Sequence, residues 1–210
     1  MFVKICGLRE PATLAAAIEA GADAVGFVFA PGSPRTVDAE TARDLLKKAP
    51  EGILTVGVFR RQPIDEVIAT ARAARVNTVQ LHGGEPLADF ARLTAEGFGT
   101  IRALSIDEYA REAQNNPEGL HAHRLLIDAP MPGAGEPFDP TALIEHPPHG
   151  DWLLAGGLHP GNVAELVAAT AATGVDVSSG VESARGHKDS TLIRRFIAAA
   201  RASEEPARTS

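Results

Sequence analysis

The sequence predicts an α/β protein, a single (β/α)₈ TIM barrel with eight parallel strands, and three observations lead to this prediction. Eight short β-rich runs alternate with helical patterns, at a spacing of about 25 residues. Most of these runs are apolar throughout, as expected of strands buried on both faces of a parallel sheet. No Gly-x-Gly-x-x-Gly follows the first run, so a doubly wound dinucleotide-binding sheet lacks its main signature.

The elements follow in order along the chain. The predicted strands are Phe2–Cys6, Ala24–Phe29, Ile53–Phe59, Thr78–His82, Thr100–Ser105, Arg124–Asp128, Trp152–Ala155 and Val175–Ser178. The predicted helices are Pro11–Ala20, Asp38–Lys48, Ile64–Ala74, Pro86–Glu96, Asp107–Gln114, Gly161–Thr173 and Asp189–Arg201, with a short one at Pro140–Glu145. Alternation of this kind implies parallel strands joined by right-handed crossovers.

Proline and glycine mark where several helices begin and end. Pro11 and Pro63 suit first-turn positions, where a missing N–H costs nothing. Gly21, Gly97 and Gly174 stand where a helix needs a left-handed exit. These signals divide the chain into the same repeated units as the hydrophobic pattern does.

Length and composition indicate one soluble domain. A chain of 210 residues suits one well-packed core, so we expect a catalytic barrel over 1–202 and a frayed tail over 203–210. No run approaches the roughly 20 apolar residues needed to cross a bilayer. The early charge of Lys4 is unlike a signal peptide, and the single cysteine fits a reducing compartment. We therefore expect a cytoplasmic protein without membrane contact.

Charge and aromatic content argue against nucleic acid as a partner. The formal net charge is −7 and only 5% of residues are aromatic, whereas nucleic-acid binding needs a basic face and stacking rings. The histidine pairs His121/His123 and His146/His149 have no nearby cysteine or matching acidic ligand set, so we expect no metal site.

The first strand ends in the candidate base. Because side chains alternate along a strand, Lys4 and Cys6 share one face, and Val3 and Ile5 share the other. The apolar pair suits the helix layer, which directs Cys6 into the barrel mouth, where such barrels have their active sites. A thiol acts as a base only as thiolate. Lys4 either supplies the favourable charge or pairs with a carboxylate, and the alternative for Cys6 is a small buried apolar residue.

Asp128 is the candidate acid. It ends the apolar run of the sixth strand, a costly place for a carboxylate unless it is paired or functional. Partial burial would raise its pKa, as a proton donor at neutral pH requires. A helix cap or a loop salt bridge is the alternative. The same parity places Gln80 with His82, but it leaves open whether Arg102 or Ser105 points inward.

Two neighbouring strand ends carry a phosphate signal. Glycines let backbone N–H groups approach an anion, serine hydroxyls add donors, and the loops after strands seven and eight commonly bind phosphate in barrels. The candidate residues are Gly156, Gly157, Ser178, Ser179 and Gly180.

Arg35 closes the loop after the second strand. Its planar guanidinium suits a substrate carboxylate. The alternative is a surface arginine without a binding role.

Six ordered motifs give the chain a family resemblance. They are Lys4-Ile5-Cys6-Gly7, Gly21-Ala22-Asp23-Ala24-Val25-Gly26-Phe27, Ser33-Pro34-Arg35, Val79-Gln80-Leu81-His82-Gly83, Leu153-Leu154-Ala155-Gly156-Gly157-Leu158 and Gly174-Val175-Asp176-Val177-Ser178-Ser179-Gly180-Val181-Glu182. The later Gly186-His187-Lys188-Asp189 is similar to a Gly-x-Lys-Asp motif. In this combination and order, the chain resembles the phosphoribosylanthranilate isomerase family.

The resemblance implies a cofactor-independent Amadori rearrangement in tryptophan biosynthesis, on the small molecule N-(5-phosphoribosyl)anthranilate. Asp128 would protonate the furanose oxygen, and Cys6 would remove the proton from C2 of the sugar. Arg35 would hold the anthranilate carboxylate, while His82 and Asp176 would contact the substrate. The protein would be a monomer or a homodimer.

One segment departs from the family pattern. Where the family has Gly-Gly-Thr-Gly and then Phe-Asp-Trp, this chain has Pro132-Gly133-Ala134-Gly135-Glu136-Pro137-Phe138-Asp139-Pro140. The threonine hydroxyl is lost, and Glu136 adds negative charge near an anionic substrate.

Three other functions remain as alternatives. A histidine-pathway or dual-substrate isomerase would want two phosphate sites and an acidic residue in place of Cys6. A non-catalytic barrel would bind a phosphorylated metabolite without turnover. A Schiff-base lyase would use Lys4 as its nucleophile.

Overall fold

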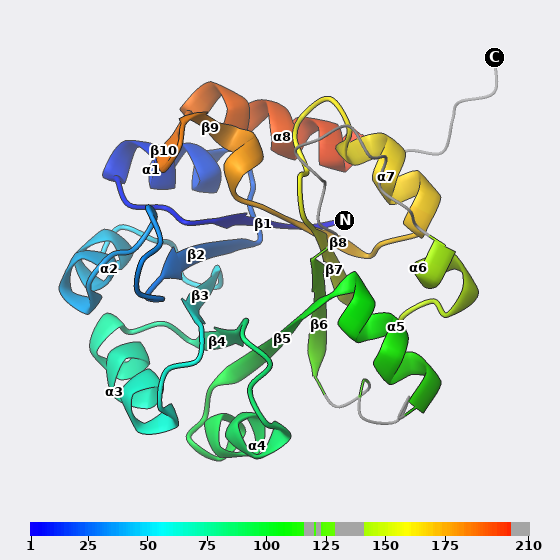
Figure 1. The fold of residues 1–210 in the computed structure, drawn as a ribbon. Helices are drawn as coiled ribbons and strands as arrows, with labels where there is room; N and C mark the ends of the chain where they lie inside the picture. The colour runs from blue at the N-terminus through cyan, green and yellow to red at the C-terminus, as the bar shows by residue number, and fades with distance from the viewer. Residues whose placement is uncertain (116–119, 121–122, 129–140, 203–210) are drawn as a thin grey trace.

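The computed structural model is a closed barrel of eight parallel strands inside a ring of helices, and Figure 1 shows it along the barrel axis. It describes residues 1–115, 120, 123–128 and 141–202. The strands follow one another around the barrel in chain order. The first strand pairs in parallel with both the second and the eighth, which closes the barrel. The predicted fold class is confirmed.

The element bounds follow the predicted alternation. The barrel strands are β1 (Phe2–Cys6), β2 (Ala24–Val28), β3 (Leu54–Phe59), β4 (Thr78–Leu81), β5 (Gly99–Ser105), β6 (Arg124–Asp128), β7 (Trp152–Ala155) and β8 (Gly174–Val177). The helices are α1 (Pro11–Glu19), α2 (Ala39–Leu46), α3 (Ile64–Ala74), α4 (Leu87–Ala95), α5 (Ile106–Asn115), α6 (Thr141–Glu145), α7 (Val163–Thr170) and α8 (Ser190–Ala202).

Strand parity divides the buried side chains into two layers. Val3 and Ile5 belong to the large cluster between the strands and the helices. Cys6 belongs to a smaller cluster inside the barrel, which is made of inward-facing residues of the other strands. The predicted orientation of the first strand is therefore confirmed.

The fifth strand resolves the alternative that its sequence left open. Ala103 lies in the inner cluster, so Arg102 must face outward. Its Nη1 and Nη2 donate to the Glu112 carboxylate on α5, at 2.8 and 2.6 Å. Ser105 has the parity of Ala103 and lies at the barrel mouth.

The seventh helix is shorter than predicted, and Gly174 does not end it. The helix stops at Thr170, and Ala171 takes the left-handed conformation (φ 53°) that we expected of Gly174. Gly174 instead begins β8. A Cβ there would lie 2.5 Å from Cδ2 of Leu153 and 3.0 Å from the carbonyl oxygen of Phe2. Close packing of the neighbouring strands, and not a helix exit, therefore requires glycine at position 174. The predicted left-handed helix exits at Gly21 and Gly97 are confirmed.

A small hairpin after β8 was not predicted. The short helix η2 (Ser179–Val181) leads into β9 (Glu182–Ala184), which pairs antiparallel with β10 (His187–Lys188).

One of the two prolines differs from its predicted place. Pro63 precedes the first turn of α3 as the N-cap, whereas Pro11 begins α1 as predicted.

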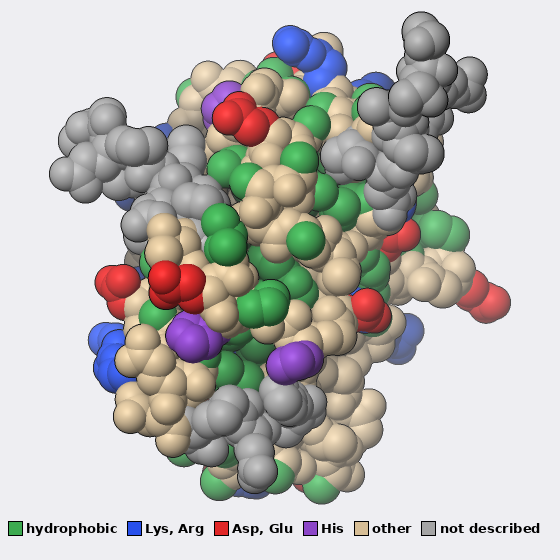
Figure 2. Space-filling view, turned by 90° about the vertical axis from the view of Figure 1, so that its right-hand side faces the viewer, with side chains coloured by type: hydrophobic (Ala, Val, Ile, Leu, Met, Phe, Trp, Pro, Cys, Tyr) green, Lys and Arg blue, Asp and Glu red, His purple; other side chains and the backbone are tan. Residues whose placement is uncertain are grey.

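Two predicted segments lie outside the described residues: the 203–210 tail and the departure over 132–140. Among the residues that are described, no helix combines the length and hydrophobicity needed to cross a bilayer. Figure 2 shows the right-hand face of Figure 1, where hydrophobic side chains gather at the centre and acidic ones lie nearer the edges.

We predict that Gly174→Ala destabilises the barrel by about 2–3 kcal/mol, because the added methyl overpacks the β7–β8–β1 contact. Chemical denaturation measures the loss. Gly21→Ala is the control: its φ is +87° but nothing lies within 4 Å of the added Cβ. We expect that variant to lose about 1 kcal/mol from backbone strain alone. Equal losses in the two variants would contradict the packing explanation.

Candidate active site

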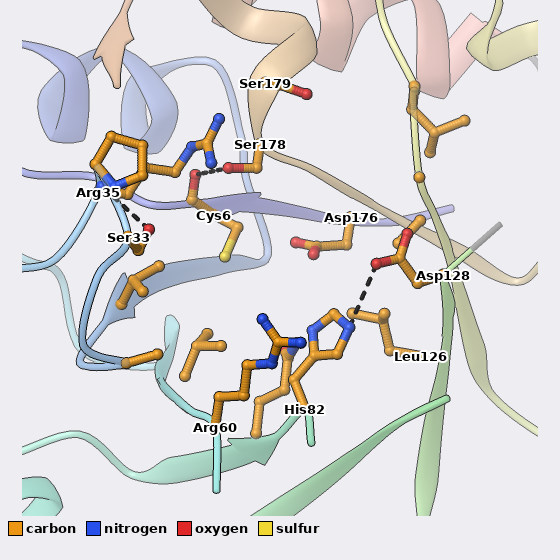
Figure 3. A pocket seen from close by; sticks show the side chains of 18 of the residues that line it. Cys6, Ser33, Arg35, Arg60, His82, Leu126, Asp128, Asp176, Ser178 and Ser179 are labelled. Atoms are coloured by element: carbon orange, nitrogen blue, oxygen red, sulfur yellow. Dashed lines mark hydrogen bonds and ion pairs between the residues drawn. The ribbon is translucent and has the colours of Figure 1, made fainter. Parts of the chain in front are cut away.

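A cavity of about 650 Å³ opens at the carboxyl ends of the strands. Its wall contains nearly every predicted site residue: Cys6, Arg35, His82, Asp128, Gly156, Gly157, Asp176, Ser178 and Ser179. Figure 3 shows Cys6 and Asp176 near its middle, Asp128 and His82 on one side, and Ser178 and Ser179 at one end. The structure thus gathers into one site residues that lie up to 173 positions apart, from Cys6 to Ser179.

Gly180 is the predicted site residue that does not line this cavity. It lies behind the cavity wall, where a Cβ would come within 1.8 Å of the Leu158 carbonyl oxygen. Glycine at this position lets the loop after β8 lie directly against the loop after β7. Its contribution is to the packing of the two loops that form the predicted phosphate site.

A buried ion pair forms the floor of the cavity. Lys4 is fully buried and its Nζ donates to Oδ1 of Asp176 at 2.8 Å and to Oε1 of Gln80 at 2.9 Å. Lys4 and Asp176 are register partners on adjacent strands, so their side chains share the barrel interior. Burial acts to lower the pKa of Lys4, but the charges of Asp176 and Cys6 outweigh it and the pKa is raised. Lys4 is therefore a permanent cation, which argues against a Schiff-base nucleophile.

Cys6 is the free thiol of the site and is buried. Burial raises the pKa of this thiol, and the charge of Lys4 offsets only part of that increase. The negative charge of Asp176 works in the same direction as burial. The Lys4 ammonium therefore limits the cost of forming the thiolate, but in the empty site Cys6 is protonated at neutral pH.

His82 and Asp128 face each other across the ends of β4 and β6. Nε2 of His82 lies 3.3 Å from Oδ2 of Asp128, and both side chains are 37% exposed (Figure 3). The carboxylate is therefore partly buried and paired, as expected at the end of an apolar run.

Arg35 is held by a carboxylate that the sequence did not assign to the site. Its Nε and Nη2 donate to Oε1 and Oε2 of Glu182, at 2.6 and 2.9 Å. Lys188 donates to Oε1 of Glu182 at 2.7 Å and to the carbonyl oxygen of Ser178 at 2.9 Å. These bonds join the loop after β2, the loop after β8 and the β9–β10 hairpin. Glu182 does not occupy Nη1 of Arg35.

The charges of this cluster fix the ionisation of Glu182. Burial acts to raise the pKa of Glu182, but hydrogen bonds from Arg35, Lys188 and the Gly186 N–H outweigh it and lower the pKa to about 2. Burial also lowers the pKa of Lys188, against the opposing effect of Glu182. Two cations and one carboxylate leave the cluster with net positive charge beside Ser178, where an anionic group would be favoured.

Sequence reasoning missed three residues of the site: Arg60, Glu182 and Lys188. Glu182 and Lys188 stand in the quoted motifs, but only the fold shows that they are buried against each other, with 5% and 3% of their side chains exposed. Arg60 follows β3 and lines the cavity, and its charged type was the available signal. Within the described ranges, no group of three or more His, Cys, Asp or Glu side chains could hold a metal ion.

The fold and this site define a class: a (β/α)₈-barrel enzyme with a thiol, an imidazole and a carboxylate at the mouth and a cluster of net positive charge at one end. The model of the N-(5'-phosphoribosyl)anthranilate isomerase family matches residues 3–199. The chain belongs to this family.

Relatives agree over nearly the whole chain. N-(5'-phosphoribosyl)anthranilate isomerase of Deinococcus radiodurans is 41% identical, over 96% of this chain and 97% of its own. The crystal structure of TrpF from Jonesia denitrificans has a TM-score of 0.86 at 41% identity and covers 97% of this chain and 98% of that one. A phosphoribosyl anthranilate isomerase in complex with reduced 1-(o-carboxyphenylamino)-1-deoxyribulose 5-phosphate has a TM-score of 0.83 at 32% identity, covering 96% and 99%.

We predict that the pKa of Cys6 in the unliganded protein exceeds the ordinary thiol value of 9.0, because burial disfavours the thiolate. Cys6 is the single cysteine, so the rate of iodoacetamide alkylation against pH measures it directly. Cys6→Ser should show no labelling, and circular dichroism should report an intact fold over the range. An inflection at or below 9.0 would mean that Lys4 outweighs burial.

We predict that Glu182→Gln weakens the acid dependence of stability. The lowered pKa of Glu182 stabilises the fold above its ordinary value of 4.5, and this contribution is lost as the pH falls toward about 2. The free energy of unfolding, measured from pH 6 to pH 3, should therefore fall more steeply in the wild type than in the variant. Glu40→Gln, at an exposed residue, should keep the wild-type slope. A wild-type slope in Glu182→Gln would be inconsistent with this assignment.

Proposed function

We propose that this chain converts N-(5'-phosphoribosyl)anthranilate into 1-(o-carboxyphenylamino)-1-deoxyribulose 5-phosphate, the isomerisation of tryptophan biosynthesis, with Asp128 as acid and Cys6 as base. Family membership supports the reaction. The observation that carries the residue roles is the placement of a thiol and a carboxylate in the wall of one cavity, on β1 and β6, with the phosphate loops at one end. General acid–base catalysis requires such groups on either side of the reacting carbon chain.

The phosphate anchors the substrate at the loops after β7 and β8. Gly156 and Gly157 line the cavity together with Ser178 and Ser179, which follow the neighbouring strand. The net positive cluster of Arg35, Lys188 and Glu182 lies directly behind Ser178. Backbone N–H groups and hydroxyls supply hydrogen bonds, and the cluster supplies the field that favours a dianion.

Ring opening is the first chemical step. The proton held by the His82–Asp128 pair passes from Asp128 to the furanose oxygen, the C1–O bond breaks, and the nitrogen lone pair forms the protonated Schiff base. A hydrogen bond from Nε2 of His82 then stabilises the charge left on the Asp128 carboxylate. The substrate's own nitrogen takes up the electrons, so these steps require no cofactor.

Proton abstraction from C2 follows. The Cys6 thiolate removes this proton, the C2 electrons form the enolamine, and tautomerisation gives the ketone. A raised pKa makes the thiolate scarce, but it also makes each thiolate a stronger base, so the two effects partly offset each other. Lys4 stabilises the thiolate, and Asp176 faces the same part of the cavity, where it can orient the sugar.

Arg35 remains our prediction for the anthranilate carboxylate. It lines the cavity, and Glu182 leaves its Nη1 amino group for a ligand. The bidentate contact with Glu182 fixes the guanidinium plane, which lowers the entropy cost of binding a planar anion.

The setting of the enzyme is also part of the proposal. We assign residues 1–202 to the catalytic domain, and we expect a cytoplasmic monomer or homodimer that acts on a small molecule and binds neither membrane nor nucleic acid. The histidine-pathway substrate, a non-catalytic binding role and the Lys4 lyase are the alternatives to be tested.

We predict that the wild type turns over freshly generated phosphoribosylanthranilate, followed by loss of its fluorescence. Cys6→Ser and Asp128→Asn should each reduce kcat by roughly a hundredfold or more, the scale of lost acid–base catalysis. Both variants should still bind the reduced product analogue, since neither residue serves its charged ends. Binding without turnover by the wild type would reject the enzyme in favour of a non-catalytic barrel.

A further inference from the structure

Arg60 carries a positive charge into the cavity beside the His82–Asp128 pair, and the mechanism above gives this charge no role. It follows β3 directly and lines the main cavity, and it also lines the smaller adjoining pocket with His82 and Ser105. In Figure 3 its guanidinium projects into the cavity beside the His82 ring. Arg60 is exposed, but its guanidinium points into the cavity, where it can meet a ligand.

Of the described residues, three arginines line this cavity. Arg35 is bound to Glu182 of the β9–β10 hairpin, and Arg185 belongs to the same hairpin. Both are therefore tied to this hairpin, while Arg35 itself stands in the loop after β2, the strand next to β3. Arg60 follows β3 directly, and no carboxylate in the described part of the chain forms an ion pair with it. Its charge is thus available to a ligand.

Backbone N–H groups next to Arg60 already donate hydrogen bonds to a carboxylate of this chain. The N–H groups of Arg61 and Gly83, which follow β3 and β4, donate to the two oxygens of Glu85 at 2.7 and 2.8 Å. These are the donors that a second phosphate would need at this end. Glu85 occupies them and adds a negative charge that repels a dianion. The remaining donor is the Arg60 side chain, which suits a planar monoanionic carboxylate.

Barrel geometry places this cation across the barrel mouth from the predicted phosphate site. In a closed ring of eight strands, β3 and β4 lie opposite β7 and β8. The phosphate and the anthranilate group occupy opposite ends of the ribose, so a phosphate at β7–β8 directs the aromatic ring toward β3–β4. Val28, Val58 and Leu126 give the cavity apolar surface between the two ends.

We propose that Arg60 is a specificity-determining residue, which binds the aromatic carboxylate of the substrate while Glu85 excludes a second phosphate from the same end. This inference rests on the proposed function and refines it. Arg35 then contributes its Nη1 from the edge of the cavity, and Arg60 selects carboxylated aromatic amines over uncharged ones. It also predicts that this site disfavours a substrate with two phosphates.

Binding of two ligands tests the proposal without depending on turnover. One is reduced 1-(o-carboxyphenylamino)-1-deoxyribulose 5-phosphate; the other is the same compound made from aniline, which lacks the carboxylate. Calorimetry should show that the wild type prefers the first. In Arg60→Gln, the affinity for the first should fall roughly 10- to 100-fold, as expected for a lost charged hydrogen bond, with the second unchanged. Arg60→Lys should recover part of the preference.

The controls separate the possible failures. Arg72→Gln removes one positive charge from the outer face of α3, where Arg72 pairs with Glu96, and should behave as the wild type. If Arg60→Gln keeps the wild-type preference, Arg60 does not select the carboxylate and the inference fails, while the proposed function stands. Equal loss of both ligands would mean a structural role and would also overturn it. A wild type that binds neither ligand would reject the proposed function itself.

Discussion

The buried Lys4–Asp176 ion pair is the constraint on which the rest of the site depends. A fully buried ammonium is stable only with close partners, and Asp176 and Gln80 provide them from β8 and β4. Loss of one partner of such a pair typically costs about 3–5 kcal/mol. The pair and Gln80 therefore hold β1, β8 and β4 together inside the barrel. Because Cys6 lies one pleat further along β1, its distance from a permanent cation is fixed as well.

This cation also determines how a buried thiol can act as a base. Burial alone would make the thiolate of Cys6 very costly, and the field of Lys4 offsets part of that cost without removing it. The remaining rise in pKa gives a stronger base that is rarely ionised. The apolar surroundings make the thiolate of Cys6 scarcer but more basic. The paired Lys4 cation restores part of the thiolate population.

Local charge, and not net charge, explains how an acidic protein can bind an anionic substrate. The chain carries a formal charge of −7. Yet Arg35, Lys188 and Arg60 place positive charge at the cavity, and Glu182 balances part of it while holding Arg35 in place. The network around Glu182 also joins three loops that are far apart in sequence. The position of Arg35 and the predicted phosphate site at Ser178 are therefore linked through one carboxylate.

The sequence by itself determined the barrel, the inward parity of β1 and the strand-end positions of Cys6 and Asp128, because strand alternation and apolar runs are local properties of the chain. Only the tertiary structure decided that Lys4 pairs with Asp176, that Glu182 and Lys188 hold Arg35 and Ser178, and that Ala171 and not Gly174 ends α7. The ion pairs join residues up to 172 positions apart. Their partners are chosen by barrel closure and packing, which no local pattern encodes.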